Sequence, residues 1–274
     1  MLVIQFIITA VGLYLSFYVL YNLSLIMIHF LIPKRTVRQI TPTTIFQILV
    51  PAHNEELLLG ILLKSIQALD YPKRMYDVIV IADNCTDQTA EVAQKKGVKT
   101  TERTDRRFTG KGYAIKYGLE RIENEAYDAV FIIDADSIVE KRTLRELDRA
   151  IQNGARIMQC YNGLINANDS WFTRLMDVSR SFGNEILEPA KEKVGLSSHL
   201  MGNGMCFVRD VITRYGWDAF TVGEDWEYYA KVVLHGERVA FVNKARVYHN
   251  ESVNLRQATT QRLRWSGGRF AVAA

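Results

Sequence analysis

AVFIIDADS, residues 129–137, is the stretch that decides the fold, because an apolar run ends there in two aspartates, Asp134 and Asp136. Two earlier segments have the same design: FQILVPA (46–52) and DVIVIAD (77–83) are apolar runs that lead directly into polar residues. Short apolar runs bounded by turn-forming or polar residues are typical of buried strands. We therefore predict three buried strands, each with functional side chains at its carboxyl end.

Segments with helical spacing separate these runs. Leucine and isoleucine recur every three or four residues over 58–69, 115–122 and 144–151, and a further helix is expected between Asp87 and Gly97. Strands that alternate with helices in this way predict an α/β fold with a largely parallel sheet, covered on both faces. Ligands of such sheets bind at the carboxyl ends of the strands. The polar clusters are therefore expected to form one site.

The N-terminal segment predicts a membrane anchor. Residues 1–32 contain no Asp, Glu, Lys or Arg, and about 20 apolar residues suffice for a helix to cross a bilayer. Lys34, Arg35 and Arg38 follow, so the positive-inside rule places the downstream domain in the cytoplasm. We expect a single-pass protein of the cell membrane, with a transmembrane helix over 1–32 and a linker over 33–45.

Composition excludes several classes of protein. The chain has 274 residues, 48% of them hydrophobic, and a net charge of +4, which fits a globular domain and not a disordered chain. Three widely spaced cysteines form no C-x-x-C pair, so they predict free thiols and not a zinc site. No nucleic-acid-binding motif is present, and we expect no nucleic acid partner. Neither a dinucleotide fingerprint nor a P-loop occurs, which makes NAD binding and P-loop hydrolysis poor interpretations.

The two aspartates at the end of 129–137 fit a divalent cation. Two hard oxygen donors suit Mg²⁺ or Mn²⁺, which take phosphate oxygens as further ligands. A metal there would neutralise a diphosphate leaving group. Taken alone, however, the D-x-D pattern also fits a solvated turn.

Two further patterns carry candidate chemistry. Asp225 lies in the first turn of a predicted helix, whose dipole favours the ionised carboxylate, and such a group can accept a proton from an alcohol. Gln261, Arg264 and Trp265 fall on one helix face, where the guanidinium can bind a phosphate and the indole can pack on a sugar ring. The alternatives are an ordinary acidic first turn and an interfacial helix with a Trp anchor, and the latter is compatible with the functional role.

Together these segments resemble a known family. ILVPAHNEE, VIVIADNCTDQTAEVA, GKGYAIKYGL, FIIDADS, GNGM, GEDWE and QRLRW occur in the order found in membrane-bound family 2 glycosyltransferases, the group of cellulose, hyaluronan and poly-N-acetylglucosamine synthases. The resemblance covers about residues 46–268. It implies a GT-A glycosyltransferase domain over 46–254 and an amphipathic interfacial helix, carrying QxxRW, over 255–274. One departure is Ala82, which stands where the family often has the first of two paired aspartates.

The resemblance implies a role for each matched residue. Residues implied to bind the nucleotide sugar are Pro51, Asn54, Glu55, Asp83, Lys111, Asp134 and Arg264. Those implied to hold Mg²⁺ or Mn²⁺ are Asp136 and Asp134. Asp225 is the implied catalytic base. Residues implied to bind the acceptor are Gly202, Asn203, Gly204, Gln261 and Trp265.

The resemblance implies an inverting transfer from a UDP-sugar to a polysaccharide or glycan acceptor at the cytoplasmic face, in contact with membrane lipids. Transfer to a lipid acceptor is the alternative within the family. A haloacid-dehalogenase-like phosphatase is a less favoured alternative, because IIDADSI resembles its nucleophile loop but two strand–helix units precede it. A non-catalytic membrane-anchored subunit is a third. Relatives continue into further transmembrane helices, so we expect this chain either to be a fragment or to be unable to secrete its product alone.

Overall fold

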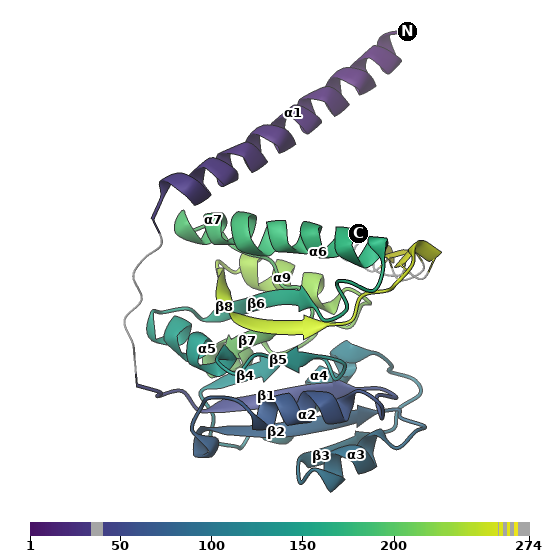
Figure 1. Ribbon diagram of the computed structural model, residues 1–274, viewed down its shortest axis with the longest axis vertical. Coiled ribbons are helices and arrows are strands. Elements are labelled where there is room, and N and C mark those ends of the chain that lie inside the picture. Colours follow the sequence, from purple (N-terminus) through teal and green to yellow (C-terminus); the bar gives the residue numbers. More distant parts are fainter. Residues whose placement is uncertain (34–40, 257, 260–261, 264–265, 268–274) are drawn as a thin grey trace.

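The computed structural model describes residues 1–33, 41–256, 258–259, 262–263 and 266–267. Within these residues the strands form one sheet in the order β3-β2-β1-β4-β7-β6-β8-β5 (Figure 1). The strand bounds are β1 Phe46–Ala52, β2 Tyr76–Asp83, β3 Lys99–Arg103, β4 Ala129–Ile132, β5 Ile138–Val139, β6 Ile157–Leu164, β7 Met205–Val208 and β8 Val239–His249.

The first half of the sheet is parallel, as the sequence predicts. β1 pairs in parallel with both β2 and β4, and β2 pairs in parallel with β3. The third predicted strand is shorter than expected: β4 ends at Ile132, so Asp134 and Asp136 lie beyond it, in a turn where the Ser137 amide donates to the Asp134 carbonyl at 3.2 Å. Because both aspartates lie in this turn, their side chains do not follow the positions on the sheet faces that a strand would impose.

The second half of the sheet is mixed, which corrects the expectation of a largely parallel sheet. β7 runs antiparallel to both β4 and β6, while β6 and β8 are parallel and β5 is antiparallel to β8. Because β7 is antiparallel to β4, Met205 at its start pairs with Ile132 at the end of β4, and the loop before β7 reaches the carboxyl ends of the parallel strands. The two halves therefore share one edge at which a site can form.

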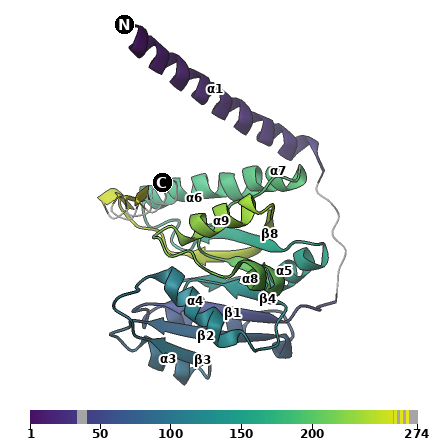
Figure 2. The ribbon, with the colours of Figure 1, turned by 180° about the vertical axis from the view of Figure 1, so that it is seen from behind.

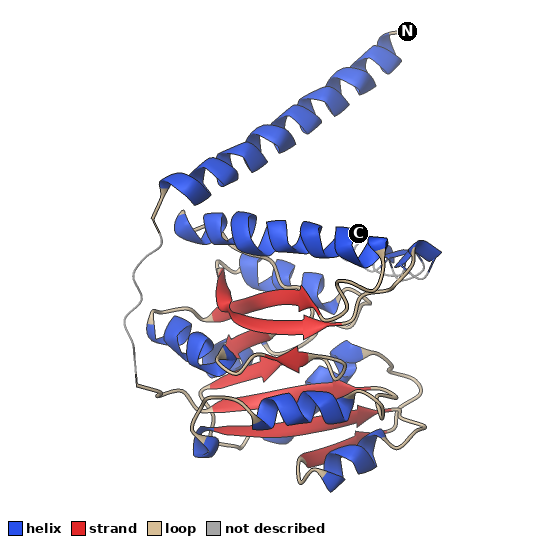
Figure 3. Cartoon of the chain, in the orientation of Figure 1, coloured by secondary structure: helices blue, strands red, loops and turns tan. Residues whose placement is uncertain are grey.

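Helices cover both faces of the sheet (Figure 3). One core joins β1 and β4 to α2, α3 and α5, and the other joins the opposite face to α4, α8 and α9 (Figure 2). The doubly covered sheet predicted from the alternating pattern is thus confirmed. The bounds of these helices are α2 Leu59–Gln67, α3 Thr89–Lys95, α4 Lys111–Ile122, α5 Thr143–Gln152, α8 Arg209–Tyr215 and α9 Glu224–Leu234, with a short 3₁₀ turn, η1, at Lys73–Met75.

A further helical layer lies outside the sheet, and α1 leads away from it. The layer consists of α6 (Trp171–Phe182), the π-helical turn η2 (Gly183–Leu187) and α7 (Glu188–Lys193). The end of α1 (Leu2–Leu31) packs on η2 and α7, and the rest of it projects away from the domain (Figures 1 and 2). At 1.5 Å per residue, this 30-residue helix is about 45 Å long, enough to cross a bilayer core of about 30 Å.

Candidate active site

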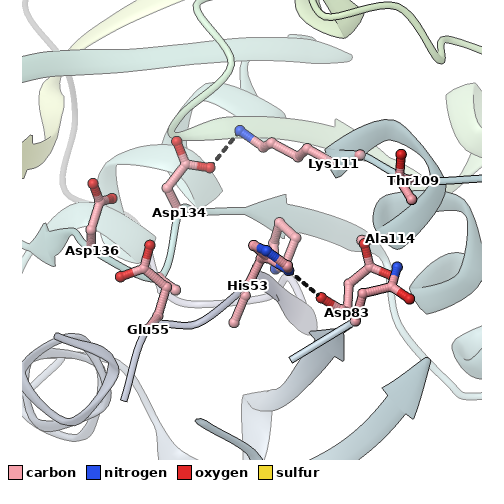
Figure 4. A pocket seen from close by; sticks show the side chains of 13 residues that line it. His53, Glu55, Asp83, Thr109, Lys111, Ala114, Asp134 and Asp136 are labelled. Carbon is pink, nitrogen blue, oxygen red and sulfur yellow. Dashed lines mark hydrogen bonds and ion pairs between the residues drawn. The ribbon is translucent and has the colours of Figure 1, made fainter. Parts of the chain in front are cut away.

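A cavity of about 510 Å³ opens at the carboxyl ends of β1, β2 and β4, beside the N-terminus of α4. Figure 4 shows three carboxylates on one side of it and Asp83 on the other. Its lining includes six residues that the sequence analysis assigned to donor or metal binding: Pro51, Glu55, Asp83, Lys111, Asp134 and Asp136. Residues far apart in the sequence are thus brought together in one site.

Asp83 forms a buried ion pair at one end of the cavity. Its Oδ1 atom lies 2.6 Å from Nη1 of Arg103, because the β2–β3 register places the two residues opposite each other. The sequence analysis missed Arg103, since its relation to Asp83 depends on that register. A carboxylate beside a guanidinium offers both acceptors and donors, as the edge of a nucleobase requires.

Asn54, which was expected to bind the nucleotide sugar, shapes the loop next to this pair. Its backbone has a φ of 56°, in the left-handed region that Asn tolerates better than most residues. Its side-chain oxygen accepts a hydrogen bond of 2.8 Å from the Thr86 amide. Asn54 therefore ties the turn after β1 to the turn after β2.

The other end of the cavity carries clustered negative charge. Burial and the charges of Asp136 and Asp134 raise the pKa of Glu55 to about 7. Burial and the charge of Asp134 likewise raise the pKa of Asp136. Carboxylates that resist ionisation because they repel one another are stabilised by a nearby cation. This end of the cavity therefore favours a divalent metal or another cationic group.

His249, the last residue of β8, is a further candidate metal ligand that the sequence analysis missed. Its Nδ1 atom is buried with no hydrogen-bond partner in the described structure. Burial and the charge of Arg180 lower the pKa of His249 to about 4, and Asp134 opposes this effect. The ring is therefore neutral at pH 7, as a metal-ligating imidazole must be. From the sequence, only the position of His249 at the end of a strand, like the polar residues after the other strands, could have suggested this role.

Lys111, the first residue of α4, joins this cluster to the loops on the opposite side. Its ammonium group forms an ion pair with Asp134, donates to the Gly202 carbonyl at 2.6 Å and lies 3.6 Å from Oε1 of Glu224. Burial alone would lower the pKa of Lys111, but the carboxylates of Asp134 and Glu224 outweigh it and raise the pKa above its usual range. The lysine is therefore charged at neutral pH.

Asp225 lies close to this lysine. A Cβ atom on Gly202 would stand 3.4 Å from Oδ2 of Asp225 and 3.7 Å from Nζ of Lys111. Gly202 also has a φ of 78°, so this position demands glycine for its backbone as well as for space. The structure thus brings together three of the residues that the sequence assigned to separate motifs.

The neighbouring glutamates have other contacts. Glu224 is buried and paired with Lys111, and burial raises its pKa although Lys111 opposes the effect. Glu227 accepts hydrogen bonds of 2.9 Å from the backbone amides of Phe220 and Thr221. Asp225 is partly exposed, unlike Glu224, and lies beside Gly202 and Lys111, whereas Glu227 is occupied by backbone amides.

Asn203 holds two loops of the site together. Its Oδ1 atom accepts from the Asp134 amide at 3.1 Å and its Nδ2 atom donates to Oγ of Ser137 at 2.9 Å. Its carbonyl accepts from Gln159 at 2.8 Å and from Asn162 at 3.0 Å. The side chain is 5% exposed and stabilises the turn that carries the two aspartates. Direct binding of the acceptor by Asn203 stays a prediction.

Three predicted residues cannot be placed. Gln261, Arg264 and Trp265 lie outside the described residues. Neighbouring described positions, among them Arg262 and Leu263, are helical. The Arg262 guanidinium lies 5.5 Å from the centre of the Phe172 ring, so this part of the chain contacts α6.

Gly204, another predicted acceptor-binding residue, lies within the described structure. Its φ is 69°, and a Cβ atom at this position would lie 2.8 Å from Cγ2 of Val247, so the position requires glycine.

Comparison with known proteins gives the family. Residues 42–268 match the family described as "Glycosyltransferase like family 2", and the chain belongs to it. It is therefore a family 2 glycosyltransferase domain with a GT-A fold, which decides against the haloacid-dehalogenase-like phosphatase.

Individual relatives agree with this assignment. The chain is 25% identical over 230 residues to the "Probable glycosyltransferase YdaM" of Bacillus subtilis (strain 168), covering 81% of this chain and 54% of that protein. It is 25% identical over 232 residues to the "Beta-monoglucosyldiacylglycerol synthase" of Synechocystis sp., covering 81% and 47%. The chain spans about half the length of these curated relatives. Neither name describes a cellulose or hyaluronan synthase, so the resemblance to that particular group is not confirmed.

A solved structure supports the fold. The mannosyltransferase PcManGT from Pyrobaculum calidifontis, in complex with GDP-Man and Mn²⁺, superposes with a TM-score of 0.73 at 21% identity. The match covers 97% of this chain and 74% of that one. At this level of identity the likeness concerns the fold alone.

The role of Asn203 predicts a loss of stability. In Asn203→Ala the Asp134 amide and the Ser137 hydroxyl lose a buried partner, which costs about 1–3 kcal/mol of unfolding free energy. The thermal midpoint should fall by about 2–4 °C for each kcal/mol. Asn153→Ala, an exposed control at the end of α5, should change it by less than about 0.5 kcal/mol. Equal thermal midpoints for the two variants would contradict the assigned role.

Proposed function

We propose that this chain transfers a sugar, with inversion, from a nucleoside diphosphate sugar to a hydroxyl group of an acceptor. The observation that carries the proposal is the arrangement of the cavity: Asp83, which pairs with Arg103, lines one end, and Glu55, Asp134 and Asp136 line the other. A nucleoside diphosphate with a divalent cation matches this arrangement, because the base can bind at one end and the cation can join the diphosphate to the carboxylates at the other. Family membership supports the same chemistry.

The base of the donor binds beside Asp83 and Arg103. Uracil presents an N–H donor flanked by carbonyl acceptors, which complements a carboxylate next to a guanidinium. Guanine also presents an N–H donor beside a carbonyl, and the structural neighbour contains GDP-mannose. We propose UDP as the carrier, following the sequence resemblance, and GDP as the competing carrier that an assay must include. Pro51 and Asn54 would shape the nucleoside side of the site.

Mg²⁺ or Mn²⁺ would bind to Asp136 and Asp134. The raised pKa of Asp136 fits a cation at this place, whereas His249 does not form a group of three possible ligands with the two aspartates in the described residues. Within the described residues no three acidic, His or Cys side chains form a complete ligand set. That agrees with a metal that keeps water and takes phosphate oxygens as ligands. When bound, it would neutralise the charge of the leaving diphosphate.

The residues of the chain would carry out the remaining steps. Asp225 accepts the proton of the acceptor hydroxyl while that oxygen attacks the anomeric carbon, and the bond from that carbon to the diphosphate oxygen breaks. The Lys111 ammonium, next to Asp134, adds positive charge on the diphosphate side. Gly202, which has no side chain, leaves space between the base and the lysine for the reacting groups. Gly204, Gln261 and Trp265 would contact the acceptor, and Arg264 the diphosphate.

Attachment to the membrane is part of the proposal. We place α1 across the bilayer and residues 46–254, the proposed GT-A domain, in the cytoplasm, with residues 255–274 as an interfacial helix. The absence of ionisable Asp, Glu, Lys and Arg from residues 1–32 and the basic residues after them support this orientation.

A lipid is the second candidate acceptor beside a polysaccharide or glycan. The Synechocystis relative, by its name, makes a glucosylated diacylglycerol. A membrane-anchored transferase would meet such an acceptor at the surface of the bilayer. Membrane extract and soluble glycans should therefore be offered separately in any assay.

Metal dependence provides the first test of the function. The purified chain in vesicles is incubated with UDP-glucose, UDP-N-acetylglucosamine or GDP-mannose and each acceptor, and release of nucleoside diphosphate is measured. We expect excess chelator to abolish transfer and Mn²⁺ or Mg²⁺ to restore it. Asp136→Asn should lose activity, whereas Asp169→Asn, an exposed control, should keep it. Full turnover in excess chelator would contradict the metal site.

The base provides an independent test. Asp225→Asn keeps the shape of the side chain but removes the proton acceptor, so transfer should fall by about 10²–10⁴-fold. Affinity for the donor should change little, because the base contacts the acceptor. Asp218→Asn alters an exposed aspartate that pairs with Lys231 and serves as the control. If Asp225→Asn transferred sugar at the wild-type rate, the base would have to be another residue.

A further inference from the structure

Helix α6 has an apolar stripe that no part of the described structure covers. It consists of Trp171, Leu175, Val178 and Phe182, which are 66%, 58%, 66% and 41% exposed. Their spacing of four, three and four residues places them on one side of the helix. The opposite side carries the buried Phe172 and Thr173 and packs on β6. Hydrophobic residues on both sides of a helix indicate two partners, and the sheet is only one of them.

The stripe lies next to the place where α1 leaves the domain. α1 packs on η2 and α7, the direct continuation of α6, and its Leu25 is 1% exposed. The Lys193 ammonium, at the end of α7, donates to the carbonyls of His29 and Ile32 at 2.5 Å each. In both ribbon views the layer formed by α6 and α7 separates α1 from the rest of the domain (Figures 1 and 2).

The contact of α1 with η2 and α7 determines how far α6 lies from a bilayer that α1 would cross. Most of α1 is apolar and exposed, and only lipid can cover a helix of this length and composition if it spans a membrane. Because Lys193 and α7 hold the end of α1, the helical layer must then lie against the membrane surface. The side of α6 that is turned away from the sheet is the side that carries the stripe.

Neighbouring residues continue the apolar surface and surround it with positive charge. Val194 and Leu196 follow α7 and are 41% and 44% exposed, and Leu263, in the segment that contacts α6, is 69% exposed. Arg174 and Arg262 are exposed beside the stripe. Apolar side chains flanked by arginines are typical of helices that lie in the interface of a membrane with anionic lipids.

We propose that α6 lies in the plane of the membrane interface and inserts Trp171, Leu175, Val178 and Phe182 among the lipid chains. The proposal rests on the membrane attachment of α1 proposed above and extends it to a second point of contact. Two contacts fix the orientation of the catalytic domain, whereas a single helix followed by a linker would leave it free to rotate. The entrance of the site then keeps a constant orientation relative to the bilayer.

The test measures the surroundings of single residues in the full chain. Leu175→Cys and Val178→Cys are each made in a Cys85→Ser background, since Cys160 and Cys206 are fully buried. Each cysteine is spin-labelled, and the protein is placed in vesicles of phosphatidylcholine and phosphatidylglycerol. Collisions with oxygen, which concentrates in lipid, are compared with collisions with a water-soluble nickel chelate. Leu15→Cys on α1 and Lys95→Cys, on the distant α3, are the controls.

We expect the ratio of oxygen to nickel collisions at Leu175→Cys and Val178→Cys to be severalfold higher than at Lys95→Cys and to approach the ratio at Leu15→Cys. A water-like ratio on α6 with a lipid-like ratio at Leu15→Cys would overturn the proposal and leave the membrane span intact. Exclusion of both reagents from α6 would mean that a protein, such as a second copy, covers the stripe, and would also overturn it. A water-like ratio at Leu15→Cys would contradict the membrane span itself.

Discussion

The candidate active site depends on a single ammonium group. Lys111 begins α4, and its side chain contacts residues from three other segments: Asp134 beyond β4, Gly202 before β7 and Glu224 at the start of α9. The first of these belongs to the parallel half of the sheet and the other two to the mixed half. The contacts of Lys111 therefore hold the two halves of the sheet together at the candidate site. Removal of its charge would leave two partly buried carboxylates without a partner.

Lys111 compensates only part of the negative charge in the cavity, because it pairs with Asp134 and Glu224 but not with Glu55 or Asp136. Glu55 and Asp136 both have raised pKa values, because burial and neighbouring carboxylates oppose their ionisation. A protein gains no stability from such an arrangement unless a ligand uses it. In the proposed function, a divalent cation that carries a diphosphate would relieve this repulsion, because its positive charge favours the ionised carboxylates.

Sequence patterns predicted the parts of the molecule that depend on local chemistry. The strand over 46–52 and the polar ends of the parallel strands follow from apolar runs that stop at charged residues, and Lys111 and Asp134 do meet as the motifs implied. Long-range pairing was not predictable in the same way. The antiparallel β7, the pairing of Arg103 with Asp83 and the position of His249 all depend on strand registers that a single sequence does not reveal. The apolar spacing of α6 is visible in the sequence, but only the structure shows which side stays exposed.

The central claim is that the carboxylate end of the cavity binds a nucleoside diphosphate through a divalent metal. Calorimetric titration of UDP and GDP into the wild-type chain, with and without Mn²⁺, tests it most directly, with Asp136→Asn as the comparison. The account predicts that Mn²⁺ tightens binding of at least one nucleotide to the wild type by about tenfold or more, about 1.4 kcal/mol, and has little effect on Asp136→Asn. Equal affinity with and without Mn²⁺, or the same gain in the variant, would contradict the account.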